Sequence, residues 1–476
     1  MPAIFRRTTL YIPETRSAIV LLLAMGLVAN PAFSADGSES QVAATPDAST
    51  SAEAGANWGN YSGASATVFG NDVSVGAAQQ SVTAGYELGG TGIAGGRVPA
   101  EGAILTATGH GRPIRFENGI FVYPSVLLGF GHNDNVGGTK DNRVGSNLWV
   151  LRPELVTEIK THGGRYTLSY LGNYGHYENS SSDDFNHHEL WMAGDNYFTS
   201  RARLGWGVGY IERSDPRGST NRVSSAEPDR WHAPVVRALG IYGAQGAIGR
   251  LELETSFMQK RYENNRAYTE VADVDLTMLS GRFFYRVLPR TSLVFEARNT
   301  WANYVSTAAF PGDNSDLRLY AGLTWDATAK TTGMIKLGRA YKSFADANIS
   351  DSSSLSWEGN LRWSPLTYST FDLASSRTPS DSTGVGDYVI NSATSLTWNH
   401  KWASYVSSRV SAGLVKTDFT GVDRRDNTKN YGIGFYTEVG YRTRVGVDFT
   451  RTDRNSTIDT NDFKRNVVMG TVEFVL

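Results

Sequence analysis

The feature that most constrains this sequence is a two-residue alternation of apolar and polar side chains, which recurs from residue 119 to the last residue. Between Leu355 and Trp363 every odd residue is apolar or glycine, and every even residue is polar or charged. The segments 317–325 and 431–441 repeat this pattern. Because successive side chains of a β-strand point to opposite faces, each segment predicts a strand with one apolar and one polar face.

The lengths and connections of these segments favour a membrane barrel over a soluble β-sandwich, which would show the same alternation. The segments run for about 10 to 14 residues, whereas a tilted strand needs roughly 9 to 11 to cross a bilayer and soluble strands average five or six. Long polar connections lie at 132–143, 179–187, 214–232, 263–270, 306–315, 345–354, 379–387, 418–429 and 454–463. Short turns lie near 160–164, 199–202, 245–248, 289–291, 328–331, 365–368, 399–402 and 441–443. This sorting predicts about eighteen strands, with long loops outside the cell and both termini in the periplasm.

The predicted fold is an all-β, transmembrane, antiparallel up-and-down β-barrel over residues 119–476. Backbone groups in lipid need partners within the protein, so the strand at 119–131 should pair with the strand at 464–476 and close the sheet. The apolar face then points outward to lipid. Seven tryptophans fall on that face, several near strand ends, where aromatic belts form: Trp149, Trp206, Trp301, Trp325, Trp357, Trp363 and Trp398.

The inward face is predicted to carry charges of both signs, which line the lumen: Arg152, Glu154, Glu252, Glu254, Arg282, Arg286, Glu296, Arg298, Arg318, Lys336, Glu358, Arg362, Asp372, Arg409, Glu438 and Asp448. The mixed signs predict ion pairs and weak ion selectivity. A barrel of this size is wide enough for an aqueous channel, although loops or the N-terminal segment could block it. The register of 233–244 is ambiguous, and Arg339 falls on the lipid face unless a bulge intervenes.

The N-terminal third of the chain has a different composition. Three arginines precede an apolar run at 19–29, and small residues follow it, which predicts a signal peptide over residues 1–34. An uncleaved anchor is the alternative, but the run is short for a bilayer. Residues 35–118 are rich in Ala, Gly, Ser and Thr and predict a mostly disordered periplasmic segment, or alternatively a plug folded inside the lumen.

Several kinds of chemistry find no support in the sequence. The chain has no cysteine, and a net charge of -2 argues against strong electrostatic capture of nucleic acid or anionic lipid by the chain as a whole. Gly205–Gly209 precedes no helix, so a phosphate loop is not expected. His187 and His188 should point in opposite directions, and Asp453, Asp459 and Asp462 favour an acidic loop over a Ca²⁺ site. No convergent catalytic set occurs, so we expect no enzyme, metal or cofactor.

Four stretches carry a resemblance to a known family: Phe121–Val136, Leu151–Leu155, Tyr166–Tyr170 and Arg213–Ser219. They are similar to the putative β-barrel porin 2 family over roughly 119–476. The resemblance implies an outer-membrane barrel without catalytic residues. It further implies a role in passing an exopolysaccharide or capsular polysaccharide outward, together with a periplasmic polysaccharide-export protein. A porin for small solutes, general or specific, is the main alternative, and a surface adhesion barrel is a third.

Overall fold

The computed structural model describes residues 113–475 except 220–224, 245–246, 310–311, 329 and 383. The predicted signal peptide and residues 35–112 of the predicted low-complexity segment lie outside this range. In the described part, no helix is long and apolar enough to cross a membrane.

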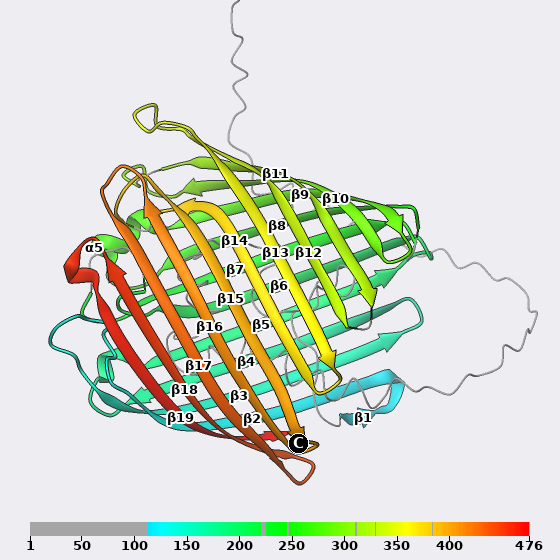
Figure 1. The fold of residues 1–476 in the computed structure, drawn as a ribbon, viewed down its shortest axis with the longest axis horizontal. Helices are drawn as coiled ribbons and strands as arrows, with labels where there is room; N and C mark the ends of the chain where they lie inside the picture. The colour runs from blue at the N-terminus through cyan, green and yellow to red at the C-terminus, as the bar shows by residue number, and fades with distance from the viewer. Residues whose placement is uncertain are drawn as a thin grey trace, which may run out of the picture. The chain divides into compact units, whose positions relative to one another are not determined.

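Most of the described residues belong to long strands that are joined by loops and turns (Figure 1). A three-residue strand, β1 (Ile114–Phe116), precedes them. The long strands are β2 (Ile120–Asn133), β3 (Ser146–Thr161), β4 (Gly164–Tyr177), β5 (Phe185–Tyr197), β6 (Ala202–Asp215), β7 (Asp229–Tyr242), β8 (Gly249–Tyr262), β9 (Val274–Leu288), β10 (Thr291–Tyr304), β11 (Asn314–Thr328), β12 (Thr331–Phe344), β13 (Ser352–Leu366), β14 (Ser369–Asp381), β15 (Tyr388–Ala403), β16 (Val406–Phe419), β17 (Arg425–Val439), β18 (Thr443–Ser456) and β19 (Phe463–Val475).

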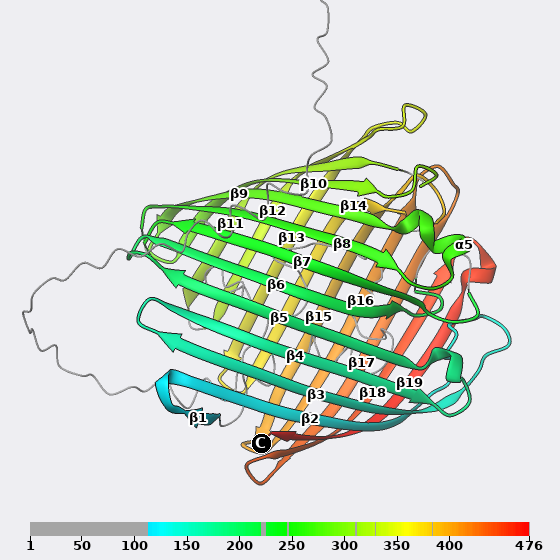
Figure 2. The same cartoon turned by 180° about the vertical axis from the view of Figure 1, so that it is seen from behind.

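The long strands form a closed antiparallel barrel of eighteen strands, β2 to β19, as the alternation predicts. Each strand pairs with the next in sequence, and β19 pairs with β2 from Val467↔Asn133 to Val475↔Ser125. Front and rear strands cross in Figures 1 and 2, as tilted strands of a barrel do. The short strand β1 pairs with the start of β2, so ordered structure begins before residue 119.

Connections at the two ends of the barrel differ in length. Nine connections at one end, here the long-loop end, run from five residues (420–424) to thirteen (216–228). Eight at the other, the short-turn end, run from two residues (162–163) to six (243–248). The predicted turn at 399–402 is wrong: these mostly polar residues belong to β15, which stays paired with β16 through Lys401↔Ser407 beyond the apolar positions, and the turn lies at 404–405.

The two faces of the sheet differ as the alternation requires. On β12, Ile335 and Leu337 are exposed on the outward face while Lys336 is buried on the inward face. All seven predicted tryptophans lie on the outward face, and their strand positions form two belts. Trp149, Trp301 and Trp357 lie toward the long-loop end, and Trp206, Trp325, Trp363 and Trp398 lie toward the short-turn end. Such paired belts mark the interfaces of a membrane.

The structure answers two questions that the sequence left open: the register of β7, and the face of the sheet on which Arg339 lies. Among the inward residues of β7 from 233 to 241, Ala233, Val235, Leu239 and Ile241 are apolar and only Arg237 is charged, so apolar side chains occupy both faces and the alternation gives little signal. Arg339 lies exposed on the outward face of β12, and the β11–β12 and β12–β13 registers continue through it without a bulge.

Candidate functional site in the barrel interior

The strand register places all of the predicted interior residues on the inward face. Ten are buried, namely Arg152, Glu252, Glu254, Arg282, Glu296, Arg298, Arg318, Lys336, Glu358 and Asp448. Glu154, Arg286, Arg362, Asp372 and Arg409 are half-buried, and Glu438 is exposed near the short-turn end. Their role as the lining of a passage stays a prediction.

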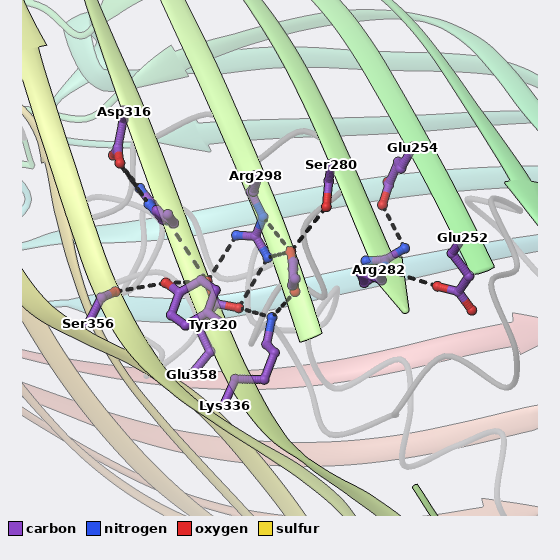
Figure 3. A network of polar contacts seen from close by, with 12 residues as sticks. Glu252, Glu254, Ser280, Arg282, Arg298, Asp316, Tyr320, Lys336, Ser356 and Glu358 are labelled. Atoms are coloured by element: carbon purple, nitrogen blue, oxygen red, sulfur yellow. Dashed lines mark hydrogen bonds and ion pairs between the residues drawn. The ribbon is translucent and has the colours of Figure 1, made fainter. Parts of the chain in front are cut away.

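Five of these residues meet in one network on β10 to β13 (Figure 3). Two carboxylates, Glu296 and Glu358, share two cations. Lys336 Nζ donates to Glu296 Oε2 and to Glu358 Oε2 at 2.6 Å each. Arg298 donates to Glu296 Oε1 at 2.9 Å through Nε and to Glu358 Oε1 at 2.9 Å through Nη1. Arg318 Nη1 lies 3.9 Å from Glu358 Oε1. Each carboxylate therefore has two or more positive partners.

Polar side chains that the sequence analysis did not single out complete the network. Tyr320 donates to Glu358 Oε1 at 3.3 Å and shares a 2.7 Å hydrogen bond with Ser356. Ser280 donates to Glu296 at 3.1 Å, and Arg318 pairs with Asp316 at 2.8 Å. The two-residue alternation alone could have identified Tyr320 and Asp316 as inward residues, since both lie on even positions of β11, as Arg318 does. The six charged groups of the network sum to zero.

The strand register explains why these residues come together. Lys336 lies directly opposite Glu358 on β13, and Glu296 lies opposite Tyr320 on β11. Tyr320 faces Gly338 on β12. A Cβ at Gly338 would lie 1.8 Å from the Leu319 carbonyl oxygen, so only glycine allows β11 and β12 to approach this closely. The Arg298 side chain reaches Glu358 on β13 across the two intervening strands.

A second group of charges continues along the wall on β8 and β9. Arg282 donates to Glu252 through Nε and to Glu254 through Nη2, at 2.9 Å each. Arg250 Nη2 lies 3.1 Å from Glu252, so two arginines face two glutamates. Further along, Arg362 donates to Asp372 at 2.6 Å. The inward wall from β8 to β14 is thus strongly polar, yet its charges neutralise one another locally.

Part of the long-loop end is covered by its own loops. Arg217, in the β6–β7 loop, donates to Asp183 of the β4–β5 loop at 2.7 Å. Arg454, on the inward face of β18, donates to the carbonyl oxygen of Gly218 at 2.8 Å. Because β5, β4, β3, β2 and β19 separate β6 from β18 in the ring, this loop crosses part of the opening. Arg465 on β19 also binds the Asn135 carbonyl oxygen at 2.8 Å and so fixes the β2–β3 loop.

Comparison with known families identifies the chain. A model of the family described as putative beta-barrel porin 2 matches residues 117–475. The chain belongs to this family. No curated protein matches the chain. The family and the fold together place this porin-like barrel in the outer membrane.

A comparison with solved structures finds outer-membrane proteins that are similar to this chain at low identity. The FrpB iron transporter from Neisseria meningitidis is 10% identical, with a TM-score of 0.41 over 70% of this chain and 62% of FrpB, so the chain spans less than two thirds of that transporter. OpdO from Pseudomonas aeruginosa is 13% identical, with a TM-score of 0.44 over 75% and 97%. A bacterial polysaccharide outer membrane secretin is 11% identical, with a TM-score of 0.36 over 76% and 100%.

Other groups of residues in this porin-family chain have structural partners. His187 points inward to the Ser214 hydroxyl at 2.9 Å, whereas His188 points outward to the Tyr170 hydroxyl at 2.9 Å. Gly209 accommodates the Trp191 ring, since a Cβ there would lie 2.5 Å from it.

The three aspartates that could have formed a Ca²⁺ site, of which Asp453 lies in β18, bind different groups. Asp453 lies 3.8 Å from Lys464, Asp459 pairs with Lys140, and Asp462 accepts the Ser456 amide at 2.6 Å. Among the described residues, no three His, Asp or Glu side chains gather as metal ligands do.

Some interior pairs were missed because they depend on contacts between distant segments. Lys260 of β8 donates to the Tyr262 hydroxyl at 2.7 Å, and that hydroxyl donates to Asp215 of β6 at 2.7 Å. Lys342 lies 2.6 Å from Asp381 across β12 and β14. The two-residue alternation places Lys260 and Lys342 on the inward face. No pattern in the sequence indicates which residues on other strands they contact.

Proposed function

We propose that this chain forms an outer-membrane conduit that exports an exopolysaccharide or capsular polysaccharide together with a periplasmic export protein. In this arrangement the long-loop end faces outward and the short-turn end faces the periplasm. The observation that carries the proposal is the locally neutral, hydrogen-bonding inward wall. Glu296 and Glu358 are each matched by Arg298 and Lys336, so the polar wall carries no strong net field that would select small ions, which suits the passage of a hydroxyl-rich, hydrated polymer.

The covered long-loop end supports the same proposal. A polymer conduit must stay shut between export events, and the Arg217–Asp183 and Arg454–Gly218 contacts tie the β6–β7 loop across part of the opening. A partner on the periplasmic side would supply the polymer and favour the open arrangement. The same contacts argue against a pore that stands open to solutes at all times.

Deleting the gene tests the proposal. The expected result is polymer retained in the periplasm and lost from the cell surface, with recovery when the wild-type gene is returned. Normal surface polysaccharide in the deletion strain would contradict the proposal.

A porin for small solutes is the second candidate, because a barrel of eighteen strands is wide enough for an aqueous channel. Planar-bilayer recordings of the purified full-length protein separate the two functions. The export proposal expects long closed periods in the absence of a partner. Steady open-channel conductance favours the porin.

A further inference from the structure

Basic side chains gather on the outward face of four neighbouring strands at the long-loop end. Lys416 on β16, Lys429 on β17, Arg451 on β18 and Lys464 on β19 all point away from the interior. We call these four residues the outer basic patch. The patch follows directly on the lipid-facing apolar residues of the same strands: on β17, for example, Lys429 comes two residues before the exposed Tyr431.

The strand register makes the patch continuous. Lys429 lies opposite Leu414 on β16, so Lys416 is its diagonal neighbour. Arg451 lies opposite Tyr431 on β17 and opposite Asn466 on β19, so Lys429 and Lys464 are its diagonal neighbours. Diagonal residues on one face of a sheet are about 7–8 Å apart, which long basic side chains span easily.

The acidic residues on this surface do not neutralise the patch. Asp453 lies opposite both Lys429 and Lys464 in the register and is 3.8 Å from Lys464, and Asp418 pairs with a fifth cation, Arg425, at 2.7 Å, so two carboxylates face five cations. Within the described part of the chain, Lys416 and Lys429 have no ion pair. Five cations and two carboxylates leave a net charge of +3 on four adjacent strands.

Outward arginines elsewhere near this end are isolated or already engaged. Arg261 on β8 pairs with Asp275 at 2.5 Å, and Arg377 on β14 donates to the Leu355 carbonyl oxygen. Arg339 lies alone among apolar neighbours on β12. The positive charge near this end is therefore concentrated on β16 to β19, which suggests a specific binding role for these strands.

We propose that the outer basic patch binds the phosphate groups of lipopolysaccharide in the outer leaflet of the outer membrane. The position fits this lipid because the acyl chains would lie against Leu414, Tyr431 and Val468 while the phosphates reach the cations just beyond them. Charge-assisted bonds to phosphate suit both Lys and Arg. The site is independent of whether the lumen carries a polymer or small solutes, but it rests on the proposed outward orientation of the long-loop end.

Lipid binding to the purified full-length protein tests this site. The triple variant Lys416→Gln/Lys429→Gln/Arg451→Gln removes three charges from the patch. A matched control, Arg290→Gln/Lys401→Gln/Arg442→Gln, removes three exposed charges from the short-turn end. Native mass spectrometry of the protein in detergent would measure binding of bisphosphorylated lipid A and of dephosphorylated lipid A. The heat-modifiable shift on SDS gels confirms that each variant is folded.

The wild type and the control are expected to bind bisphosphorylated lipid A equally, and the triple variant on the order of 100-fold more weakly, since each basic residue contributes roughly fivefold to anionic-lipid binding. Dephosphorylated lipid A should bind weakly to all three proteins. If the triple variant fails to fold, Lys416→Arg/Lys429→Arg should bind like the wild type and Lys429→Gln more weakly. Equal binding by the triple variant and the wild type would overturn the proposal, as would displacement of lipid A by inorganic phosphate at equimolar concentration.

Discussion

Replacing Glu358 by glutamine tests whether the interior network behaves as a buried set of ion pairs. The side chain of Glu358 is 4% exposed and accepts from Arg298, Lys336 and Tyr320 at 2.6 to 3.3 Å. The Glu358→Gln variant keeps the shape but removes one negative charge, so three cations face two carboxylates. Removing one partner of a buried pair costs about 3–5 kcal/mol. Because the amide oxygen still accepts one hydrogen bond, we expect about 3 kcal/mol, or about two orders of magnitude in the folding equilibrium.

Equilibrium urea unfolding in lipid vesicles, followed by tryptophan fluorescence, measures this change. Glu438→Gln is the matched control, since it removes an exposed inward carboxylate and should change stability by no more than about 0.5 kcal/mol. The double variant Lys336→Met/Glu358→Gln should recover part of the loss, because it restores charge balance. Equal unfolding midpoints for Glu358→Gln and Glu438→Gln would refute the reasoning and mean that water, not Lys336 and Arg298, compensates Glu358.

Three further predictions concern the loops and the outward face. The Arg217→Ala variant removes the pair with Asp183, which is 1% exposed. It should raise the ratio of open to closed channels in planar-bilayer recordings about 30-fold, as expected if the lost contact stabilises the closed form by about 2 kcal/mol. An unchanged ratio would contradict a role of this contact in holding the β6–β7 loop across the opening. The hydrogen bond from Lys140 holds the pKa of Asp459 below its ordinary 3.8 and raises the pKa of Lys140 above 10.5. The ion pair should therefore persist from about pH 4 to about pH 10. It should be lost when the Asp459 carboxylate is protonated in acid or when the Lys140 ammonium loses its proton in base. In the Lys140→Gln variant, carboxyl NMR should show the pKa of Asp459 returning toward 3.8, and an unchanged pKa would count against the contact. The Val447→Arg variant puts a charge in the middle of the apolar face of β18 and should cost about 2–4 kcal/mol in vesicle unfolding; a cost near zero would place Val447 outside lipid.

The fold was largely predictable because lipid outside and a polar interior impose one simple rule on every strand. Residues 355–363 alternate without exception and lie within β13. The rule fails where both faces are apolar, as with Val235 and Val236 of β7. It also fails at strand ends: β17 begins at Arg425, inside the predicted loop 418–429, because strands continue beyond the apolar belt.

The candidate site was predictable only in part. The two-residue alternation shows that Arg298 and Glu358 share the inward face. However, they are sixty positions apart in the sequence and lie on strands three places apart in the ring. Which inward residues meet depends on strand tilt and stagger, which the local sequence does not specify. The loop contact between Arg217 and Asp183 depends on how two loops fold over the opening, and neither loop carries a pattern that indicates it.

A transmembrane barrel requires a sheet with lipid on one face and a polar interior on the other. The chain has no cysteine, so single substitutions from Tyr431→Cys through Tyr436→Cys along β17 allow an accessibility scan in lipid vesicles. Spin labels at 431, 433 and 435 should be relaxed mainly by oxygen, which dissolves in lipid, and labels at 432, 434 and 436 mainly by a water-soluble nickel complex. Accessibility that does not alternate with a period of two, or that alternates with the opposite phase, would contradict the barrel described.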